Sequence, residues 1–232
     1  MELSSLKNKH KYEDVWVIGS GSSLDFIDKS FFENKITVGV NRSCCYFECD
    51  YVVAKDLRGL EEIEENTLNK NIQKIYSLFN CGNTTSTRND ENNDKDIIYF
   101  HHPQNGNPRT EIIGTTNSNG EDLIIVSLST ITSAIHIAAY MGAKNIIICG
   151  HDCGKLNNNI SIKGYNSIIP PVQGANEYVE WLNRIENHTI KVCKKLKEVY
   201  NCNIHSLNPF INFNLEGFKF ESNPKINERR FS

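Results

Sequence analysis

Small and hydroxyl-bearing residues follow a short apolar run near the start of the chain. After VWVI come, in order, Gly19, Ser20, Gly21, Ser22 and Ser23. Glycines in such a turn let the backbone approach a phosphate closely, and the N–H groups at the start of a following helix attract an anion. The turn therefore predicts a phosphate site, which valine at position 21 should block without disturbing the fold. The alternative is a turn without a ligand, capped by Ser22 or Ser23.

Polar residues also follow three later apolar runs. Asn41 comes after ITVGV, Ser129 and Thr130 come after LIIVSL, and Gly150 and Asp152 come after IIIC. A hydroxyl pair at the start of a helix is ordinarily a plain N-cap. If the pair lies at the same edge of a sheet as the glycine turn, it can instead bind the phosphate and ribose of a nucleotide. We predict one continuous nucleotide pocket formed by these residues and the glycine turn.

Three side chains are candidates for moving a proton or holding a metal. His151 directly follows an apolar run, and imidazole exchanges protons near neutral pH; a hydrogen-bonded turn residue is the alternative for it. His188 stands in a long amphipathic stretch, where a solvent-facing position is the alternative. Asp56 follows YVVA and Lys55, and its carboxylate suits Mg²⁺ or contact with an acceptor. His101, after IIYF, stays unassigned.

Elements that would position these residues are indicated by the hydrophobic pattern. Continuous apolar runs, typical of buried parallel strands, occupy 15–18, 36–40, 51–54, 97–100, 123–126, 146–149 and 203–205. Apolar residues at helical spacing predict one helix over 130–141 and a longer one from about 177 to 200. The alternation predicts a doubly wound, Rossmann-like α/β fold with a mostly parallel sheet and helices on both faces. Ligands of such sheets bind beyond the carboxyl ends of the strands, where the candidate residues are expected.

The domain organisation is expected to be simple. A length of 232 residues suits a single Rossmann-like transferase domain over 1–232. Segments 80–96 and 103–120 are rich in Asn, Thr, Asp and Gly, and we expect loops there. A third irregular segment, at about 154–176, follows a strand and contains Pro170 and Pro171. Because loops at this edge of a sheet often cover a site, we expect a lid-like insertion.

Charge and composition argue against several classes of protein. With 25 basic and 28 acidic residues the net charge is −3, which does not favour a nucleic-acid partner. No apolar run approaches the roughly 20 residues of a membrane-spanning helix, and no secretory signal is recognisable. We expect a cytoplasmic protein, at most peripheral to the inner face of the membrane. The 8 cysteines lack paired C-x-x-C spacing, so we expect free thiols rather than a zinc site at Cys149, His151, Asp152 and Cys153.

Longer stretches of the chain resemble two related families. The stretch VIGSGSSLDFID, then VGVNR, then STITSAIHIAAYMGAKNIIICGHD resembles bacterial sialyltransferases that use CMP-activated sialic acid. The stretch DYVVAKD and the later IIICGHD are similar to the 6-hydroxymethylpterin diphosphokinase-like family, which includes motility accessory glycosyltransferases. Each motif is loose, but their order and spacing agree over about 15–153.

The resemblance implies a role for each residue at its matching position. Gly19, Gly21 and Ser23 would face the nucleotide phosphates, and Asn41 the base or sugar of the donor. Ser129 and Thr130 would hold the donor's phosphate or carboxylate. Gly150 and Asp152 would close over the nucleoside. 

The chain departs from the sialyltransferase pattern at two positions. The sialyltransferases carry a lid histidine that acts as general base, and the comparable position here is Arg184 rather than His188. An arginine precedes their Ser/Thr pair, where this chain has Ser127.

Three functions follow from the resemblance. The first is glycosyl transfer from a CMP-linked, sialic-acid-like donor to a glycan or small-molecule acceptor, with no obligatory metal. The second is diphosphate transfer from ATP, which would require Mg²⁺ held by Asp56. The third is a nucleotide-binding module without catalysis. We favour the first, and a homo-oligomer is compatible with all three.

Overall fold

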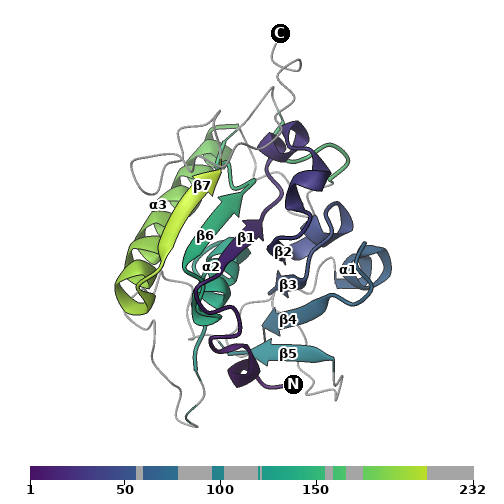
Figure 1. Ribbon diagram of the computed structural model, residues 1–232. Coiled ribbons are helices and arrows are strands. Elements are labelled where there is room, and N and C mark those ends of the chain that lie inside the picture. The colour runs from purple at the N-terminus through teal and green to yellow at the C-terminus, as the bar shows by residue number, and fades with distance from the viewer. Residues whose placement is uncertain are drawn as a thin grey trace.

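A seven-stranded parallel sheet forms the centre of the computed structural model, which describes residues 1–55, 60–77, 96–101, 120, 122–154, 159–165 and 175–207. The strand order is β5-β4-β3-β2-β1-β6-β7, and every neighbouring pair is parallel (Figure 1). The strands are β1 Asp14–Ile18, β2 Ile36–Val40, β3 Tyr51–Ala54, β4 Gln73–Ser77, β5 Ile97–Phe100, β6 Asn145–Cys149 and β7 Asn203–Leu207. The α-helices are α1 Leu60–Asn66, α2 Thr130–Tyr140 and α3 Ala175–Tyr200. The prediction of a Rossmann-like α/β fold is confirmed.

Each face of the sheet is covered, because alternate side chains of a strand point to opposite faces. Val15 and Val17 of β1 pack in one core with α2 and α3. Trp16 and Ile18 pack in a second core, with α1 and short 3₁₀ helices over Ser22–Phe26, Lys29–Phe32 and Asn41–Cys45. Both faces are therefore buried, which explains why the strands are continuously apolar.

The order of the strands places a crevice beside β1. From β1 the chain proceeds outward through β2, β3, β4 and β5, and then returns to add β6 and β7 on the other side of β1. The direction of winding thus reverses between β1 and β6. In open parallel sheets, ligands bind at such a reversal, beyond the carboxyl ends of the strands.

One predicted strand is not part of the sheet. The run 123–126 makes a single bridge, between His101 and Leu123, and otherwise lies along α2. Its backbone is satisfied by buried side chains of that helix: the Ile125 N–H donates to His136 Nδ1 at 2.9 Å, and the Ser133 hydroxyl donates to the Ile125 carbonyl at 2.8 Å. The run is apolar because it packs under α2, and apolar character alone does not distinguish this from a strand.

Two elements, β4 and α1, are not predicted by the sequence patterns. Strand β4 begins with Gln73 and Lys74, so it lacks the continuous apolar run of its neighbours. Helix α1 is only 7 residues long and buries just Leu60 and Ile63, too few positions to show a helical period. Both are fixed by their neighbours in the fold.

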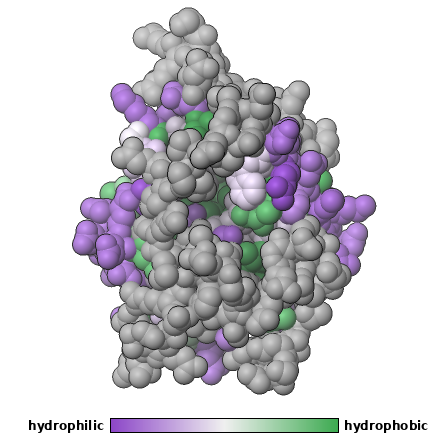
Figure 2. All heavy atoms as spheres, turned by 180° about the vertical axis from the view of Figure 1, so that it is seen from behind, coloured by the Kyte–Doolittle hydropathy of each residue, from purple (hydrophilic) through white to green (hydrophobic). Residues whose placement is uncertain are grey.

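The surface of the described part is mainly polar. Figure 2 shows hydrophilic residues at both sides of its face, with small apolar areas between them. No described helix combines the length and apolar character that crossing a membrane requires. The seven cysteines within the described ranges are free thiols, and five of them are buried.

Candidate functional site

The glycine turn packs tightly against the loop that follows β6. The Gly19 N–H donates to the Cys149 carbonyl at 2.8 Å, and the Gly21 N–H donates to the Gly150 carbonyl at 2.7 Å. A Cβ atom at Gly19 would lie 2.4 Å from the Gly150 oxygen, and one at Gly21 would lie 2.4 Å from Asp152 Oδ2. The two glycines are therefore required by the approach of one loop to another. The expectation that Gly21→Val leaves the fold intact is wrong for this reason.

The 3₁₀ helix after the turn is capped by a carboxylate of the chain itself. Ser23 donates its N–H to Asp152 Oδ2 at 2.8 Å and its hydroxyl to Oδ1 at 2.5 Å. Asp152 is 3% exposed, and burial raises the pKa of its carboxyl while the Ser23 bonds lower it. Ser22 donates its hydroxyl to the Asn159 carbonyl at 2.8 Å. A ligand phosphate at these serines would have to replace existing hydrogen bonds.

The described part of the expected lid-like insertion is fastened to the glycine turn. The Ile162 N–H donates to the Ser20 carbonyl at 2.9 Å, and the Lys163 N–H donates to the Asp25 carboxylate. The Tyr165 ring lies 4.5 Å from the Arg42 guanidinium carbon. Segment 159–165 thus covers the end of β1 from the side opposite to α2.

Asn41 lies at the carboxyl end of β2 with an unusual backbone. Its φ of 52° is left-handed, a conformation that asparagine tolerates better than most residues. Ser43 fixes the backbone around it, since its hydroxyl donates to the Ile18 carbonyl at 2.9 Å and accepts from the Val40 N–H at 2.8 Å. No part of the described structure hydrogen-bonds to the half-buried Asn41 amide. Within the described part of the chain, its donor and its acceptor are therefore available to a ligand.

The N-terminus of α2 lies at the same edge of the sheet as Asn41. The opposite end of α2 lies beside the residues that lead into β1, because the Asn8 and His10 N–H groups donate to the carbonyls of Tyr140 and Met141. Helix α2 therefore runs antiparallel to the strands, and its N-terminus faces their carboxyl ends. The N-cap residue Ser129 makes no capping hydrogen bond with its side chain.

A tight turn precedes α2. The Ser129 N–H donates to the Ser127 carbonyl at 2.7 Å, across Leu128, whose φ is 60°. This is the pattern of a γ-turn with a left-handed central residue, which is rare and strained for leucine. The Ser127 N–H donates to Thr132 Oγ1 at 3.0 Å, which anchors the turn to the first turn of α2.

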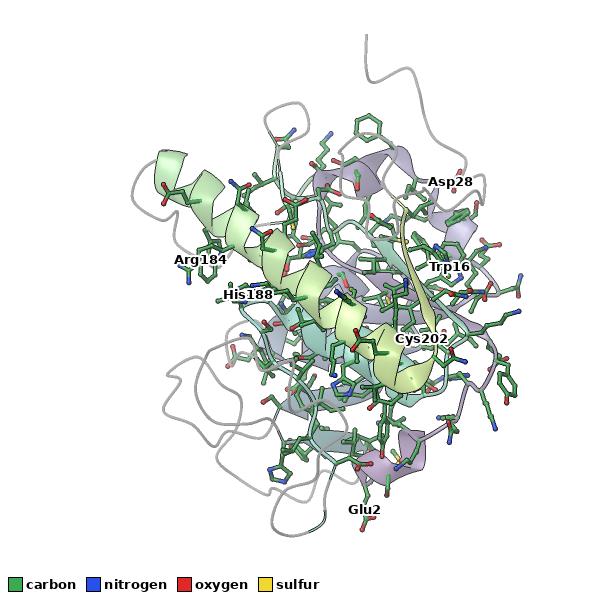
Figure 3. All side chains as sticks on the ribbon, turned by 90° about the vertical axis from the view of Figure 1, so that its left-hand side faces the viewer. Glu2, Trp16, Asp28, Arg184, His188 and Cys202 are labelled. Atoms are coloured by element: carbon green, nitrogen blue, oxygen red, sulfur yellow. The ribbon has the colours of Figure 1, made fainter. Side chains whose placement is uncertain are left out.

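His188 of α3 reaches this turn. Its Nδ1 lies 3.1 Å from Ser127 Oγ, and burial together with the charges of Lys191 and Arg184 lowers its pKa. Figure 3 shows Arg184 and His188 on the same side of α3, as expected for residues four apart on a helix. Sequence reasoning assigns Ser127 no role, and only the packing of α3 on α2 reveals its partner.

His151 lies between the end of β6 and α3. Its Nε2 is 2.9 Å from Thr189 Oγ1 and 3.5 Å from Cys153 Sγ. The Thr189 hydroxyl donates to the Ile185 carbonyl at 2.9 Å, so it must accept from His151 Nε2–H, and Nδ1 carries the lone pair. Burial lowers the pKa of His151 to about 4, so it is neutral at pH 7.

Metal binding has no support among the described residues. They contain no group of three or more His, Cys, Asp or Glu side chains placed to hold an ion, and burial raises the pKa of the Cys149 and Cys153 thiols. Asp56, the predicted Mg²⁺ ligand, lies outside the described residues.

Solved proteins share the fold of this chain, although no sequence relative was found. No protein-family profile and no curated protein sequence matches the chain. The sialyltransferase CstII of Campylobacter jejuni, solved with CMP-3FNeuAc, superimposes with a TM-score of 0.53 at 14% identity, covering 92% of this chain and 88% of that one. The α-2,3-sialyltransferase Cst-I of the same organism gives 0.51 at 16% identity, covering 87% and 78%. The chain shares their fold.

The fold of this chain also resembles part of a second kind of glycosyltransferase. The MAf glycosyltransferase of Magnetospirillum magneticum AMB-1 gives a TM-score of 0.55 at 13% identity, covering 99% of this chain but 40% of that one. Both families to which the sequence motifs point are thus represented among the structural matches. At these identities the likeness concerns the fold, and the sialyltransferase fold alone does not name a donor.

Proposed function

We propose that this chain transfers a sugar from a nucleotide-activated donor, and that the donor is a CMP-linked, sialic-acid-like sugar. One observation carries the proposal: Asn41, Ser129 and Thr130, at the carboxyl edge of the sheet, have no side-chain hydrogen bond to any described residue. They lie next to the strand-order reversal of a fold shared with CMP-sugar-binding sialyltransferases. Polar side chains at this edge that make no hydrogen bond to the described residues can bind a polar ligand.

Transfer of a sugar from a CMP-linked donor requires that the protein stabilise the negative charge on a single phosphate. The acceptor oxygen forms a bond to the anomeric carbon, the bond between that carbon and the phosphate oxygen breaks, and CMP leaves with the electron pair. The helix dipole and N–H groups of α2, aided by the hydroxyls of Ser129 and Thr130, stabilise the negative charge on the leaving phosphate. A leaving group with a single phosphate needs no metal for this, unlike the diphosphate transfer that would depend on Asp56.

The acceptor hydroxyl must lose its proton, and we assign this role to His151. Its Nε2–H is committed to Thr189, so the lone pair stays on Nδ1. It stands directly after β6, at the reversal where the donor is proposed to bind. Burial lowers the pKa of His151 to about 4, so the imidazole is neutral at physiological pH and would act as a weak base.

Binding is the first test. We expect CMP and CMP-linked sialic acid to raise the thermal unfolding temperature, and UDP, GDP and ATP to have little effect. Thr130→Val should weaken CMP binding on the order of 10-fold, because it removes a hydrogen bond to a charged group. Thr37→Val is the matched control, since Thr37 is a buried threonine at the amino end of β2, where it bonds Asp50.

Turnover is the second test. We expect hydrolysis or transfer of CMP-linked sialic acid that EDTA does not change, and a loss of about 100-fold or more in kcat in His151→Gln. ATP-dependent diphosphate transfer that EDTA abolishes, with Asp56→Asn inactive, would replace this function by the kinase alternative. Nucleotide binding without any turnover would instead support the third alternative, a nucleotide-binding module without catalysis.

A further inference from the structure

We propose that Ser127 holds His188 with its Nε2 protonated, so that His188 binds an anionic group of the donor as an N–H donor instead of acting as a base. This inference rests on the proposed function for the identity of the ligand. Ser127 is then a positioning residue, and His188 a residue that selects donors carrying a negative charge beside the N-terminus of α2.

The direction of the hydrogen bond follows from the surroundings of Ser127. The residue is fully buried, at 0% exposure, and its hydroxyl has one hydrogen-bond partner in the described structure, His188 Nδ1 at 3.1 Å. A buried hydroxyl hydrogen without an acceptor is costly, and Nδ1 is the acceptor in reach. Ser127 therefore donates to Nδ1, and in the neutral ring the hydrogen must be on Nε2.

The backbone fixes Ser127 in place. The turn from Ser127 to Ser129 is closed by a 2.7 Å hydrogen bond across Leu128, and the Ser127 N–H is held by Thr132 Oγ1. The left-handed φ of Leu128 is a conformation that leucine rarely adopts, so the surrounding structure must impose it. Such a backbone aims the Ser127 hydroxyl at α3 and gives His188 a fixed ring orientation.

The charge state of His188 agrees with this geometry. Among the described residues, the groups that act on its ring are the Ser127 hydroxyl, from the turn before α2, and the cations Arg184 and Lys191 on α3. Burial and the two cations lower the pKa of His188, so the ring is neutral at pH 7. Nε2 has no hydrogen-bond partner in the described part of the chain, and the half-buried ring contacts Ser127, two positions before the N-cap of α2. A neutral N–H donor here suits the donor's phosphate or its carboxylate.

The same substitution at two histidines separates donor binding from base catalysis. Glutamine retains an N–H donor near the position of Nε2 but cannot accept a proton. His188→Gln should therefore lose much less kcat than His151→Gln. His188→Ala should weaken binding of CMP-linked sialic acid on the order of 10-fold. If CMP binding weakens equally, the anion is the phosphate; if only the CMP-linked sugar is affected, it is the carboxylate.

Imidazole ¹H–¹⁵N correlation spectra of the whole protein test the tautomer without any turnover. We expect His188 to be neutral at pH 7 with its hydrogen on Nε2. Ser127→Ala should reproduce the binding loss of His188→Ala, and Ser133→Ala should not, although it also removes a buried hydroxyl with one hydrogen bond. A wild-type ring with its hydrogen on Nδ1, or a His188→Gln variant that binds donor but does not turn it over, would overturn the inference. Absence of turnover in the wild type would contradict the proposed function alone.

Discussion

Ser23 and Asp152, 129 positions apart in the chain, are joined by two hydrogen bonds across the crevice between β1 and β6. The carboxylate occupies the position where a helix N-terminus would otherwise attract a ligand anion. The bond therefore holds the two loops of the candidate site together, and gives Asp152 a structural role in addition to any contact with a nucleotide.

Removal of the Asp152 carboxylate should destabilise the fold. Asp152→Ala leaves the buried N–H and hydroxyl of Ser23 without an acceptor, which should lower the free energy of unfolding by about 2 to 4 kcal/mol. Asp28→Ala is the control, because Asp28 makes the same two bonds to Ser30 on an exposed surface. Urea unfolding at pH 7 measures both, and equal losses in the two variants would show that burial does not matter here.

Asp152 should also give wild-type stability a pH dependence that Asp152→Asn lacks. Its folded pKa is raised by burial above the ordinary 3.8, so the native state binds more protons than the unfolded chain. The contribution of this carboxyl to the free energy of unfolding is therefore complete below pH 3.8 and is lost as pH rises through the folded pKa. The difference in unfolding free energy between wild type and Asp152→Asn, measured from pH 3.5 to pH 8, should decrease with pH. An increase would mean that the Ser23 bonds outweigh burial.

Gly21 should tolerate no side chain. Gly21→Ala places a Cβ against Asp152 Oδ2 and the Gly150 carbonyl, so it should cost several kcal/mol, comparable to overpacking of a core. Gly164→Ala is the comparison: among the described residues its Cβ would meet Tyr46 alone, at 3.8 Å, although its φ of 87° adds strain of about 1 kcal/mol. Thermal unfolding of both variants is the measurement, and a Gly21→Ala protein as stable as wild type would refute the packing found here.

His136 should make the protein less stable in mild acid. Its ring is completely buried between the Ile125 N–H and the Tyr200 hydroxyl, and burial lowers its pKa to about 3. Because the unfolded chain takes up the proton first, stability is complete above pH 6.5 and is lost as pH falls. The loss from this residue at pH 5 should be about 2 kcal/mol. His136→Gln should remove that component, so the change between pH 7.5 and pH 5 should be smaller than in wild type.

Arg42 should control the opening of segment 159–165. Its side chain is 6% exposed, donates to Glu62 Oε2 at 2.6 Å and stacks on Tyr165. Arg42→Ala should speed amide hydrogen exchange at Ile162 and Tyr165 by about 10-fold, and Arg42→Lys should restore little, since an ammonium cannot stack as a planar group. Lys195→Ala is the control, because its ion pair with Glu198 is on the surface and contributes little. Unchanged exchange in Arg42→Ala would show that other bonds hold the segment.

Much of the fold was determined by the sequence itself. Six of the seven strands of the sheet coincide with predicted runs, because parallel strands buried on both faces are mostly apolar; β7, with the sequence NIHSL, is the exception among them. The same rule misplaced the run 123–126, whose backbone is satisfied by His136 and Ser133 of α2. Only the packed structure shows which partner takes up those hydrogen bonds.

The candidate site, too, was predictable from the sequence only in part. Local sequence identifies Asn41, Ser129 and Thr130, because each follows a strand or begins a helix, and parallel strands end at one edge. Tertiary structure decides what the side chains contact. Asp152 bonds Ser23 and His188 bonds Ser127, from segments 129 and 61 positions away, and no local pattern specifies such distant pairs. Burial, hydrogen-bond direction and therefore protonation depend on these pairs, so the chemical roles of the residues become visible only in the folded chain.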